Sequence, residues 1–345
     1  MTKSKGYAAQ SANTNLATWE FERREVGPHD VLIDILYCGV CHTDLHQINN
    51  DWFPGIFPMV PGHEIVGRIS AVGEHVTKFK NGDLAAVGCI VDSCGHCEDC
   101  NDGLEQFCTD GVQTYNSMGH DGRPAYGGYS NNIVVTEAFA HHVSNKLPLA
   151  AVAPLLCAGI TTYSPLRYWK VGPGHKVAVL GLGGLGHMAV KFAVAFGADV
   201  TVLSTSPSKE EDARKLGAHH FVVTKDAEQV AAVTKSFDFI VDTVSGAHDI
   251  NLYLPMLKTR GTNITLGAPT EPYQVPAFAL MAGAKAIAGS GIGGLAETQE
   301  MLDFCAEHNI VSDIEIIAIE DIHAAYTRME KGDVRYRFVI DMATL

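Results

Sequence analysis

The run K-V-A-V-L-G-L-G-G-L-G-H-M-A-V-K-F-A-V-A-F-G-A, residues 176–198, decides the fold. Its first five residues predict a buried strand, and the residues after the glycines carry the apolar face of a helix. A G-x-G-x-x-G turn between a strand and a helix binds dinucleotides, because the glycines permit a tight turn and the pyrophosphate lies at the helix N-terminus. We therefore expect a dinucleotide to contact Gly181, Leu182, Gly183, Gly184, Leu185 and Gly186.

After this turn, strand-like and helical segments continue to alternate along the sequence. Strand-like runs begin at Val200, Phe237 and Thr262, and amphipathic helical stretches separate them. Strands that alternate with helices are typical of an α/β fold with a doubly wound parallel sheet. We predict a Rossmann domain over residues 151–287.

The first part of the chain has a different character. Short apolar or alternating runs begin at Val31, Ile65, Asp83 and Asn132, and Gly, Pro and Asn separate them. Such closely spaced strands predict a β-rich, partly open barrel. The run Y-R-F-V-I-D-M near the C-terminus reads as a strand that returns to this domain. We assign residues 1–150 and 288–345 to it.

The strand that follows the glycine turn indicates which dinucleotide binds. An NAD site needs Asp or Glu at the end of this strand, whereas the strand here ends in Ser204, and Asp199 lies at its start. Hydroxyls and one cation suit a 2′-phosphate, so we predict NADP(H), held by Ser204, Thr205, Ser206 and Lys209. The alternative is that these hydroxyls only cap the next helix.

Nine cysteines are present, and four of them form a C-x2-C-x2-C-x7-C cluster within residues 88–110. Four thiolates close a tetrahedron around zinc and leave no open position, so a structural zinc is predicted at Cys94, Cys97, Cys100 and Cys108. An iron–sulfur cluster or buried cysteines without metal are the alternatives. His96 is expected to be an exposed turn residue, and Cys38, Cys89 and Cys305 are expected to pack in apolar surroundings.

Charge and hydropathy exclude several classes of protein. The formal net charge of −14 opposes binding to nucleic acid, which requires clustered Lys and Arg. No apolar run approaches the roughly 20 residues of a membrane-spanning helix. The N-terminus lacks the apolar stretch of a secretory signal, so we expect a cytoplasmic protein without membrane or nucleic-acid partners.

Several further motifs carry a family resemblance. They are C-G-V-C-H-T-D-L-H from Cys38, G-H-E-x2-G-x5-G-x2-V from Gly62, L-L-C-A-G-I-T-T-Y from Leu155 and E-T-Q-E-M-L-D-F-C-A-E-H from Glu297. With the four-cysteine cluster and the glycine turn, they resemble the zinc-containing medium-chain dehydrogenase/reductase superfamily, in its cinnamyl alcohol dehydrogenase group with bacterial broad-range aldehyde reductases. The resemblance implies a GroES-like catalytic domain, hydride transfer between NADP(H) and an alcohol or aldehyde, and a homodimer.

The resemblance also implies a second, catalytic zinc. Its ligands would be Cys41, His63 and Cys157, with Glu64 able to enter the resting coordination shell, although each residue taken alone reads as a packed or turn residue. Asp44 would orient His63, unless it is only a solvated turn residue. Thr43 and His46 would pass the proton to solvent. His42 and Thr161 would contact the cofactor; the alternative for His42 is that it only faces solvent.

Substrate preference is the least constrained feature. Trp52 and Tyr115 are candidates for an apolar pocket, whereas Phe53 is expected to pack elsewhere. Plant members of the group carry Trp where this chain has Gln113, so we expect a broad range of medium aliphatic and aromatic substrates. A zinc-free quinone or enone reductase and a zinc-ribbon binding module remain as alternative functions.

Overall fold

The computed structural model describes residues 1–345, and the chain divides into two compact units. Unit 1 comprises Met1–Ile160 and Gly293–Leu345, and unit 2 comprises Thr161–Ile292. The chain therefore leaves unit 1 within a helix, α4 (Ala158–Tyr168), and returns before another helix, α9 (Leu295–His308). The boundaries fall at residues 160/161 and 292/293, compared with the expected 150/151 and 287/288.

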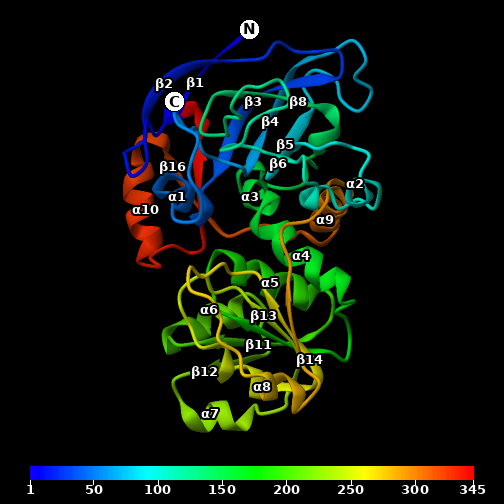
Figure 1. The fold of residues 1–345 in the computed structure, drawn as a ribbon, viewed down its shortest axis with the longest axis vertical. Helices are drawn as coiled ribbons and strands as arrows, with labels where there is room; N and C mark the ends of the chain where they lie inside the picture. The colour runs from blue at the N-terminus through cyan, green and yellow to red at the C-terminus, as the bar shows by residue number, and fades with distance from the viewer. The chain divides into compact units, whose positions relative to one another are not determined.

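Unit 2 contains one six-stranded parallel sheet, in the order β12-β11-β10-β13-β14-β15. This order places the first strand, β10, at the centre, with one half of the sheet on each side, as in a doubly wound fold. Figure 1 shows these strands together with the helices that connect them. The strands are β10 (Lys176–Leu180), β11 (Asp199–Ser204), β12 (His220–Val223), β13 (Phe237–Asp242), β14 (Leu257–Thr265) and β15 (Ala286–Gly289).

Apolar packing holds the unit 2 sheet. Helix α5 packs on β10 and β11, and a buried cluster on the sheet includes Ala178, Leu203 and Ile240. Continuous apolar runs suit parallel strands, because helices cover both faces of such sheets. The helices are α5 (Gly184–Ala195), α6 (Glu210–Lys215), α7 (Ala227–Ala232) and α8 (Ala277–Met281).

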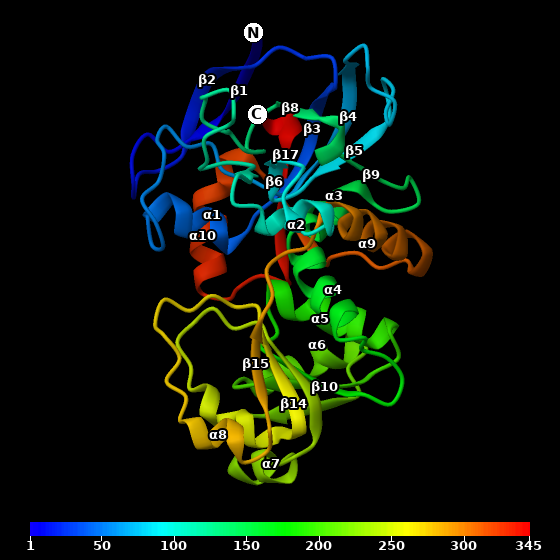
Figure 2. The ribbon, with the colours of Figure 1, turned by 45° about the vertical axis from the view of Figure 1, so that its right-hand side comes forward.

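Unit 1 is rich in β structure. Its main sheet has the order β16-β17-β3-β4-β5-β9, and β8 also pairs with β3. The predicted C-terminal strand is β17, which pairs with β3 through Ile340 and Cys38 and lies inside the sheet (Figure 2). The strands are β3 (Asp30–Gly39), β4 (Ile65–Val72), β5 (Leu84–Val87), β8 (Asn132–Thr136), β9 (His141–His142), β16 (Ile314–Ala318) and β17 (Arg337–Asp341).

Two smaller sheets and short helices complete unit 1. The antiparallel hairpin of β1 (Thr2–Ala8) and β2 (Ala17–Arg23) is one sheet, and β6 (Ile90–Asp92) with β7 (Val112–Gln113) is the other. The remaining helices are α1 (His42–Asn49), α2 (Glu98–Asn101), α3 (Leu149–Val152) and α10 (Ile322–Glu330). No single helix of the chain is long and apolar enough to cross a membrane, although the bent pair Leu149–Leu156 and Ala158–Tyr168 meets that length and composition when taken together.

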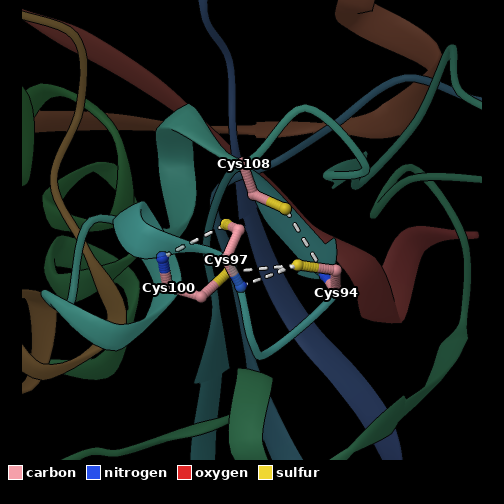
Figure 3. Close-up of side chains that lie close together, drawn as sticks. All are labelled: Cys94, Cys97, Cys100 and Cys108. Carbon is pink, nitrogen blue, oxygen red and sulfur yellow. Dashed lines mark hydrogen bonds between the residues drawn. The ribbon is translucent and has the colours of Figure 1, made fainter.

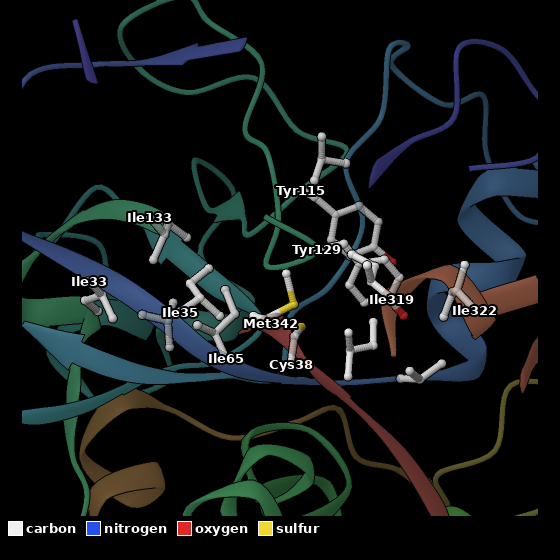
Figure 4. Packing of buried hydrophobic residues seen from close by; sticks show 14 of the residues in the cluster. Ile33, Ile35, Cys38, Ile65, Tyr115, Tyr129, Ile133, Ile319, Ile322 and Met342 are labelled. Carbon is white, nitrogen blue, oxygen red and sulfur yellow. The ribbon is translucent and has the colours of Figure 1, made fainter. Parts of the chain in front are cut away.

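The core of unit 1 joins segments from both ends of the chain. Ile33 and Ile35 of β3 and Ile65 of β4 belong to the same buried cluster as Ile319 and Ile322 of the C-terminal segment (Figure 4). The cluster also includes Tyr115 and Tyr129, whose rings reach it from loops. This core holds the C-terminal end of β3 and the N-terminal end of β4 in place. The expected metal ligands Cys41 and His63 lie next to these two ends.

Candidate active site

Four donor side chains of unit 1 converge on one point. The donor atoms of Cys41, His63, Glu64 and Cys157 all lie within 4.8 Å of one another, and all four residues are buried. The Sγ atoms of Cys41 and Cys157 are 3.9 Å apart. Tetrahedral zinc with Zn–S bonds of about 2.3 Å separates two sulfurs by roughly 3.8 Å. The spacing of the two thiols therefore matches one zinc ion.

The unused atoms at this point also suit a metal. His63 Nε2 and Glu64 Oε2 are buried and have no hydrogen-bond partner in the protein. A buried polar atom without a partner costs roughly 1–3 kcal/mol, and coordination to a metal removes that cost. Hydrogen bonding from Cys157 lowers the pKa of Cys41 well below its usual range, and Arg337 and His63 lower it further. The donor set therefore fits a cation that binds thiolate and imidazole.

Each donor is positioned by a distinct local structure. Cys41 is the N-cap of α1, directly after the end of β3, and His63 precedes β4. Cys157 lies at the junction between a short 3₁₀ turn and α4. Because these three segments are far apart in the sequence, only the packed fold of unit 1 brings their donor atoms together.

Asp44 is fully buried, and its carboxylate contacts both segments that carry Cys41 and His63. Its Oδ2 accepts from the Cys41 backbone N–H at 2.9 Å, and its Oδ1 accepts from the Gly62 N–H at 3.1 Å. His63 Nδ1 lies 3.3 Å from Asp44 Oδ1, which leaves Nε2 for the metal. The alternative of a solvated turn residue is wrong, because the same carboxylate caps α1 and faces the imidazole.

Glu64 is held by an arginine that the sequence did not single out. Its Oε1 accepts from the guanidinium of Arg337, and the side chains of both residues are buried. Burial raises the pKa of Glu64 to about 7, although Arg337 opposes that change. Gly39 makes room for this side chain, since a Cβ there would lie only 1.9 Å from Glu64 Oε2. Arg337 therefore holds one oxygen of Glu64, while the other oxygen is buried without a hydrogen-bond partner.

Thr43 and His46 lie on α1, one and four residues after its start at His42. His46 Nδ1 contacts Asp51 Oδ2 at 2.7 Å, and the Trp52 ring lies 4.5 Å from the imidazole centroid. His46 thus connects α1 to an exposed carboxylate. Asp51 is an addition to the expected residues.

The remaining expected residues differ in their surroundings. Tyr115 is buried, stacks on His63 at a centroid distance of 5.8 Å, and has a hydroxyl without a partner. Phe53 is exposed, and His42 is exposed at the first residue of α1. Thr161 is buried in α4. The Tyr115 ring therefore packs against the imidazole of His63, one of the expected metal ligands.

The four-cysteine cluster forms a second, separate donor set in unit 1 (Figure 3). Cys94 Sγ and Cys100 Sγ are 3.9 Å apart, and the backbone N–H groups of Cys97 and Cys94 point at Cys94 and Cys108 sulfurs at 3.3 and 3.4 Å. Amides that donate to sulfur stabilise thiolates, the form that binds zinc. His96 is exposed on this turn, with Nδ1 2.7 Å from the Cys94 carbonyl oxygen. The cluster needs no fifth ligand.

The glycine turn of unit 2 has the geometry that its sequence predicts. Gly181 has a φ of 87°, in the region that favours glycine. A Cβ on Gly186 would lie 2.2 Å from the Gly181 carbonyl oxygen, so the turn and the start of α5 touch. Gly183 is the N-cap of α5 and has no side chain to occupy the helix N-terminus. Backbone N–H groups there remain available for a phosphate.

The strand end after this turn lacks a carboxylate. Ser204 ends β11, its Oγ accepts from the Ser206 N–H at 3.2 Å, and Lys209 Nζ donates to the Leu182 carbonyl oxygen at 3.0 Å. No side chain caps the 3₁₀ turn after Ser206 or helix α6. The capping alternative therefore has no support. Lys209 instead reaches back to the glycine turn, beside Ser204.

Comparisons with known proteins agree with this geometry. Residues 27–145 match the model described as alcohol dehydrogenase GroES-like domain, and residues 184–307 match zinc-binding dehydrogenase. An aldehyde reductase of Escherichia coli is 54% identical over 347 residues, covering 99% of each chain. The chain belongs to the zinc-binding alcohol dehydrogenase family. Within this family, it has the features of the cinnamyl alcohol dehydrogenase group of the medium-chain dehydrogenases.

Solved structures of the family have the same fold. A cinnamyl alcohol dehydrogenase from Sorghum bicolor aligns with a TM-score of 0.96 at 48% identity, covering 99% of this chain and 98% of the other. The structure of CAD from Helicobacter pylori complexed with NADP(H) aligns with a TM-score of 0.94 at 46% identity, covering 99% of both chains. The expected fold, a Rossmann domain with a GroES-like domain, is confirmed.

Besides Asp51, the structure brings Cys89 and Arg337 to the donor cluster, and neither was expected as a site residue. Cys89, expected to be a packing residue, is half-buried with its Sγ 3.7 Å from the Leu156 carbonyl oxygen, and hydrogen bonding with the Cys157 thiol lowers its pKa. Arg337 lies in β17, where an arginine inside the apolar run R-F-V-I was the available signal. A charged residue in a buried strand requires a charged partner, and here that partner is Glu64.

Proposed function

We propose that this protein is a zinc-dependent alcohol dehydrogenase and aldehyde reductase that transfers hydride between NADP(H) and a broad range of primary alcohols and aldehydes. The observation that carries the proposal is the convergence of Cys41, His63, Glu64 and Cys157 within 4.8 Å. Two of these donors, His63 and Glu64, present buried atoms that lack any other partner. Family membership and the relatives named aldehyde reductase and NADP-dependent alcohol dehydrogenase support the same activity.

In this proposal Cys41, His63 and Cys157 hold the catalytic zinc, and Glu64 is an alternative ligand. When bound, zinc supplies Lewis-acid polarisation of the substrate oxygen, and NADPH supplies the hydride. Asp44 fixes the His63 ring through Nδ1, at 3.3 Å. Arg337 keeps one Glu64 oxygen engaged, so that Glu64 does not bind through both oxygens.

The proton path runs along α1. We assign the first position to Thr43, because its hydroxyl both accepts and donates, and the second to His46. His46 passes the proton to Asp51 at 2.7 Å, and Asp51 is exposed to solvent. Zinc at this site would acidify a bound alcohol, so the chain has to supply a proton relay through Thr43 and His46 rather than a strong base.

The cofactor assignment rests on the end of β11. Ser204, Thr205, Ser206 and Lys209 supply donors for a 2′-phosphate, and no carboxylate repels it there. The glycine turn and the start of α5 would receive the pyrophosphate. The family structure complexed with NADP(H) supports this choice. We assign cofactor contacts to His42 and Thr161 as well.

The competing functions have less support. A zinc-free enone reductase would leave the two buried thiols and the unpartnered His63 Nε2 without a purpose. A zinc-ribbon binding module would not need the six-stranded dinucleotide sheet. We retain Trp52 and Tyr115 as candidate substrate contacts, with preference for medium aliphatic and aromatic compounds.

The deciding experiment measures zinc content and cofactor preference on the purified protein. We expect two zinc ions per chain and faster benzaldehyde reduction with NADPH than with NADH. One zinc or none would overturn the metal assignment. A clear preference for NADH would overturn the assignment of the 2′-phosphate to the end of β11.

We also propose a cytoplasmic homodimer. All nine cysteines are free, which suits a reducing compartment. β15 is an edge strand with one unpaired side, and Phe278 and Met281 of α8 are 78% and 69% exposed. Pairing of β15 with the same strand of a second copy, across a two-fold axis, would cover its unpaired side and the exposed side chains of α8. A two-fold contact of this kind uses the same surface on both copies, so the assembly stops at two chains.

A further inference from the structure

Asp242 connects two loops at the carboxyl edge of the unit 2 sheet. It ends β13 and is fully buried. The first loop, residues 243–249, follows β13, and the second, residues 266–276, follows the adjacent strand β14. The backbone carbonyl of Asp242 accepts from the N–H groups of Leu266 and Gly267 at 2.8 and 3.0 Å. One residue thus anchors the starts of both loops.

The Asp242 side chain joins the loops a second time, farther from the sheet. His248 Nε2, from the first loop, contacts Asp242 Oδ2 at 2.9 Å, and the Tyr273 hydroxyl, from the second loop, donates to the same oxygen at 3.3 Å. His248 Nδ1 lies 2.9 Å from the Gly246 carbonyl oxygen. Both imidazole nitrogens therefore face acceptors, and the ring cannot rotate without losing one contact.

Farther from the sheet edge, a cavity separates the two segments, and Asn251 Nδ2 donates to the Gln274 carbonyl oxygen across it at 2.8 Å. A cavity of about 830 Å³ lies between residues 247–251 and 269–276, and His248 and Tyr273 line it. The side-chain contacts at Asp242 are therefore the ties between the two loops on the side of the cavity nearest the sheet.

The first loop also touches the glycine turn. Thr243 Oγ1 donates to the Leu180 carbonyl oxygen at 2.8 Å, immediately before Gly181. A Cβ on Gly181 would lie 2.9 Å from Val244 Cγ2, and one on Gly267 would lie 2.2 Å from the Val244 carbonyl oxygen. The glycine turn, the first loop and the second loop thus form one continuous wall within unit 2.

This wall belongs to one half of the cofactor site. In a doubly wound sheet the dinucleotide crosses the carboxyl ends of the strands, with one mononucleotide on each half. The end of β11 is the adenosine side, so β13 and β14 lie on the nicotinamide side. We propose that Asp242, His248 and Tyr273 form a pin that positions the two loops against the nicotinamide half of NADP(H). This inference rests on the proposed function.

His248 and Tyr273 are positioning residues under this proposal, and two probes separate that role from a general structural one. NADPH occupies both halves of the site, whereas adenosine 2′,5′-bisphosphate occupies only the adenosine half. We would measure the dissociation constants of both probes for the zinc-loaded protein and for His248→Gln and Tyr273→Phe. Tyr253→Phe is the matched control, since Tyr253 packs edge-on against His248 at 6.1 Å.

We expect the dissociation constant of NADPH to rise about ten-fold in each of the two pin variants, because a buried partner of Asp242 is lost. The dissociation constant of adenosine 2′,5′-bisphosphate should change less than about two-fold. The double variant should weaken NADPH binding no more than about two-fold beyond His248→Gln, because both side chains act through one carboxylate. Tyr253→Phe should bind both probes like the unmodified protein.

Two results would overturn the pin. Unchanged NADPH binding in both variants would show that the loops need no such tie. Equal weakening of the two probes would show that the substitutions disturb unit 2 as a whole. Failure of the unmodified protein to bind NADPH would instead count against the proposed function, so the two failures are distinguishable.

Discussion

The Tyr129 hydroxyl donates to Asp44 Oδ2 at 3.1 Å, inside the core of unit 1. Tyr129 is fully buried, and the Tyr326 hydroxyl in turn donates to the Tyr129 oxygen at 3.4 Å. A chain of two phenols from a loop and from α10 thus ends on the carboxylate that faces His63. Groups that hydrogen-bond to a metal ligand commonly change metal affinity about 10- to 100-fold when removed, and Tyr129 holds such a group, Asp44.

We therefore expect Tyr129→Phe to weaken the catalytic zinc about ten-fold and to leave the four-cysteine zinc unchanged. Two-phase zinc release to a chelator would measure both sites in one sample. Tyr326→Phe, one hydroxyl farther away, should have a smaller effect on the same phase. Equal acceleration of both release phases would refute a specific role for Tyr129.

Single substitutions should distinguish the catalytic zinc site from the four-cysteine zinc site. Cys157→Ser should remove one zinc per chain and lower turnover at least ~100-fold, while the thermal unfolding midpoint changes little, because this residue faces an open site. Cys94→Ser should remove the other zinc and lower the unfolding midpoint, because a closed site contributes folding free energy. Metal analysis with calorimetry checks both. Survival of activity in Cys157→Ser would disprove the ligand assignment.

The cofactor preference should follow the residue at position 204. Ser204→Asp places a carboxylate at the end of β11, where it repels a 2′-phosphate and accepts from a 2′-hydroxyl. We expect kcat/KM to fall for NADPH and rise for NADH, with a combined change in the ratio of about 100-fold. Asp199→Asn, at the opposite end of the same strand, is the control and should leave the ratio unchanged.

Stability at acid pH should depend on His141. Burial, together with the nearby charges of Lys78 and His142, lowers the pKa of His141 from 6.5 to about 3. Because the folded form keeps this ring neutral, the contribution to stability is present above pH 6.5 and is lost as the pH falls toward 3. Below pH 6 the free energy of unfolding should drop by up to about 1.4 kcal/mol per pH unit from this group.

His141→Phe should remove that part of the pH dependence. Urea unfolding at pH 7 and pH 5 gives the comparison, and other titrating groups cancel between the variants. His142→Phe, an exposed neighbour on the same strand, should retain the slope of the unmodified protein. An identical slope for His141→Phe would show that His141 does not set it.

The proposed dimer makes a prediction about α8. Phe278→Asp with Met281→Asp should convert the dimer into monomers in sedimentation experiments, because charges at a buried apolar contact are unpaired. Tyr168, 75% exposed on α4, provides a matched control as Tyr168→Asp. A monomeric unmodified protein, or a double variant that stays dimeric, would contradict the assignment to this face.

Much of the fold could be predicted from the sequence because its information is local. The runs from Val31, Ile65 and Asn132 became β3, β4 and β8, and the strand–glycine–helix run became β10 and α5. The four-cysteine set was equally local, since two-residue gaps bring sulfurs together within one turn. The β1–β2 hairpin was not predicted.

The catalytic donors were found only through family resemblance, because Cys41, His63 and Cys157 come from three separate segments. The groups that hold them were harder still. Tyr129 and Asp51 have ordinary neighbours in the sequence, and although Arg337 stands next to an apolar run, the partner of each residue is defined only by packing. Polar partners of this kind are set by tertiary contacts, for which hydrophobic periodicity carries no information.

The place of β17 in the unit 1 sheet sets an order of events during synthesis. β17 lies between β16 and β3, and it carries the arginine that holds Glu64. Unit 2 is encoded entirely between the two segments of unit 1, so the ribosome releases all of its strands before β17 emerges. A nascent chain can therefore complete its nucleotide-binding unit while its metal pocket still lacks Arg337 and one neighbour of β3. The complete pocket can therefore form only after the C-terminal segment of the chain has been made.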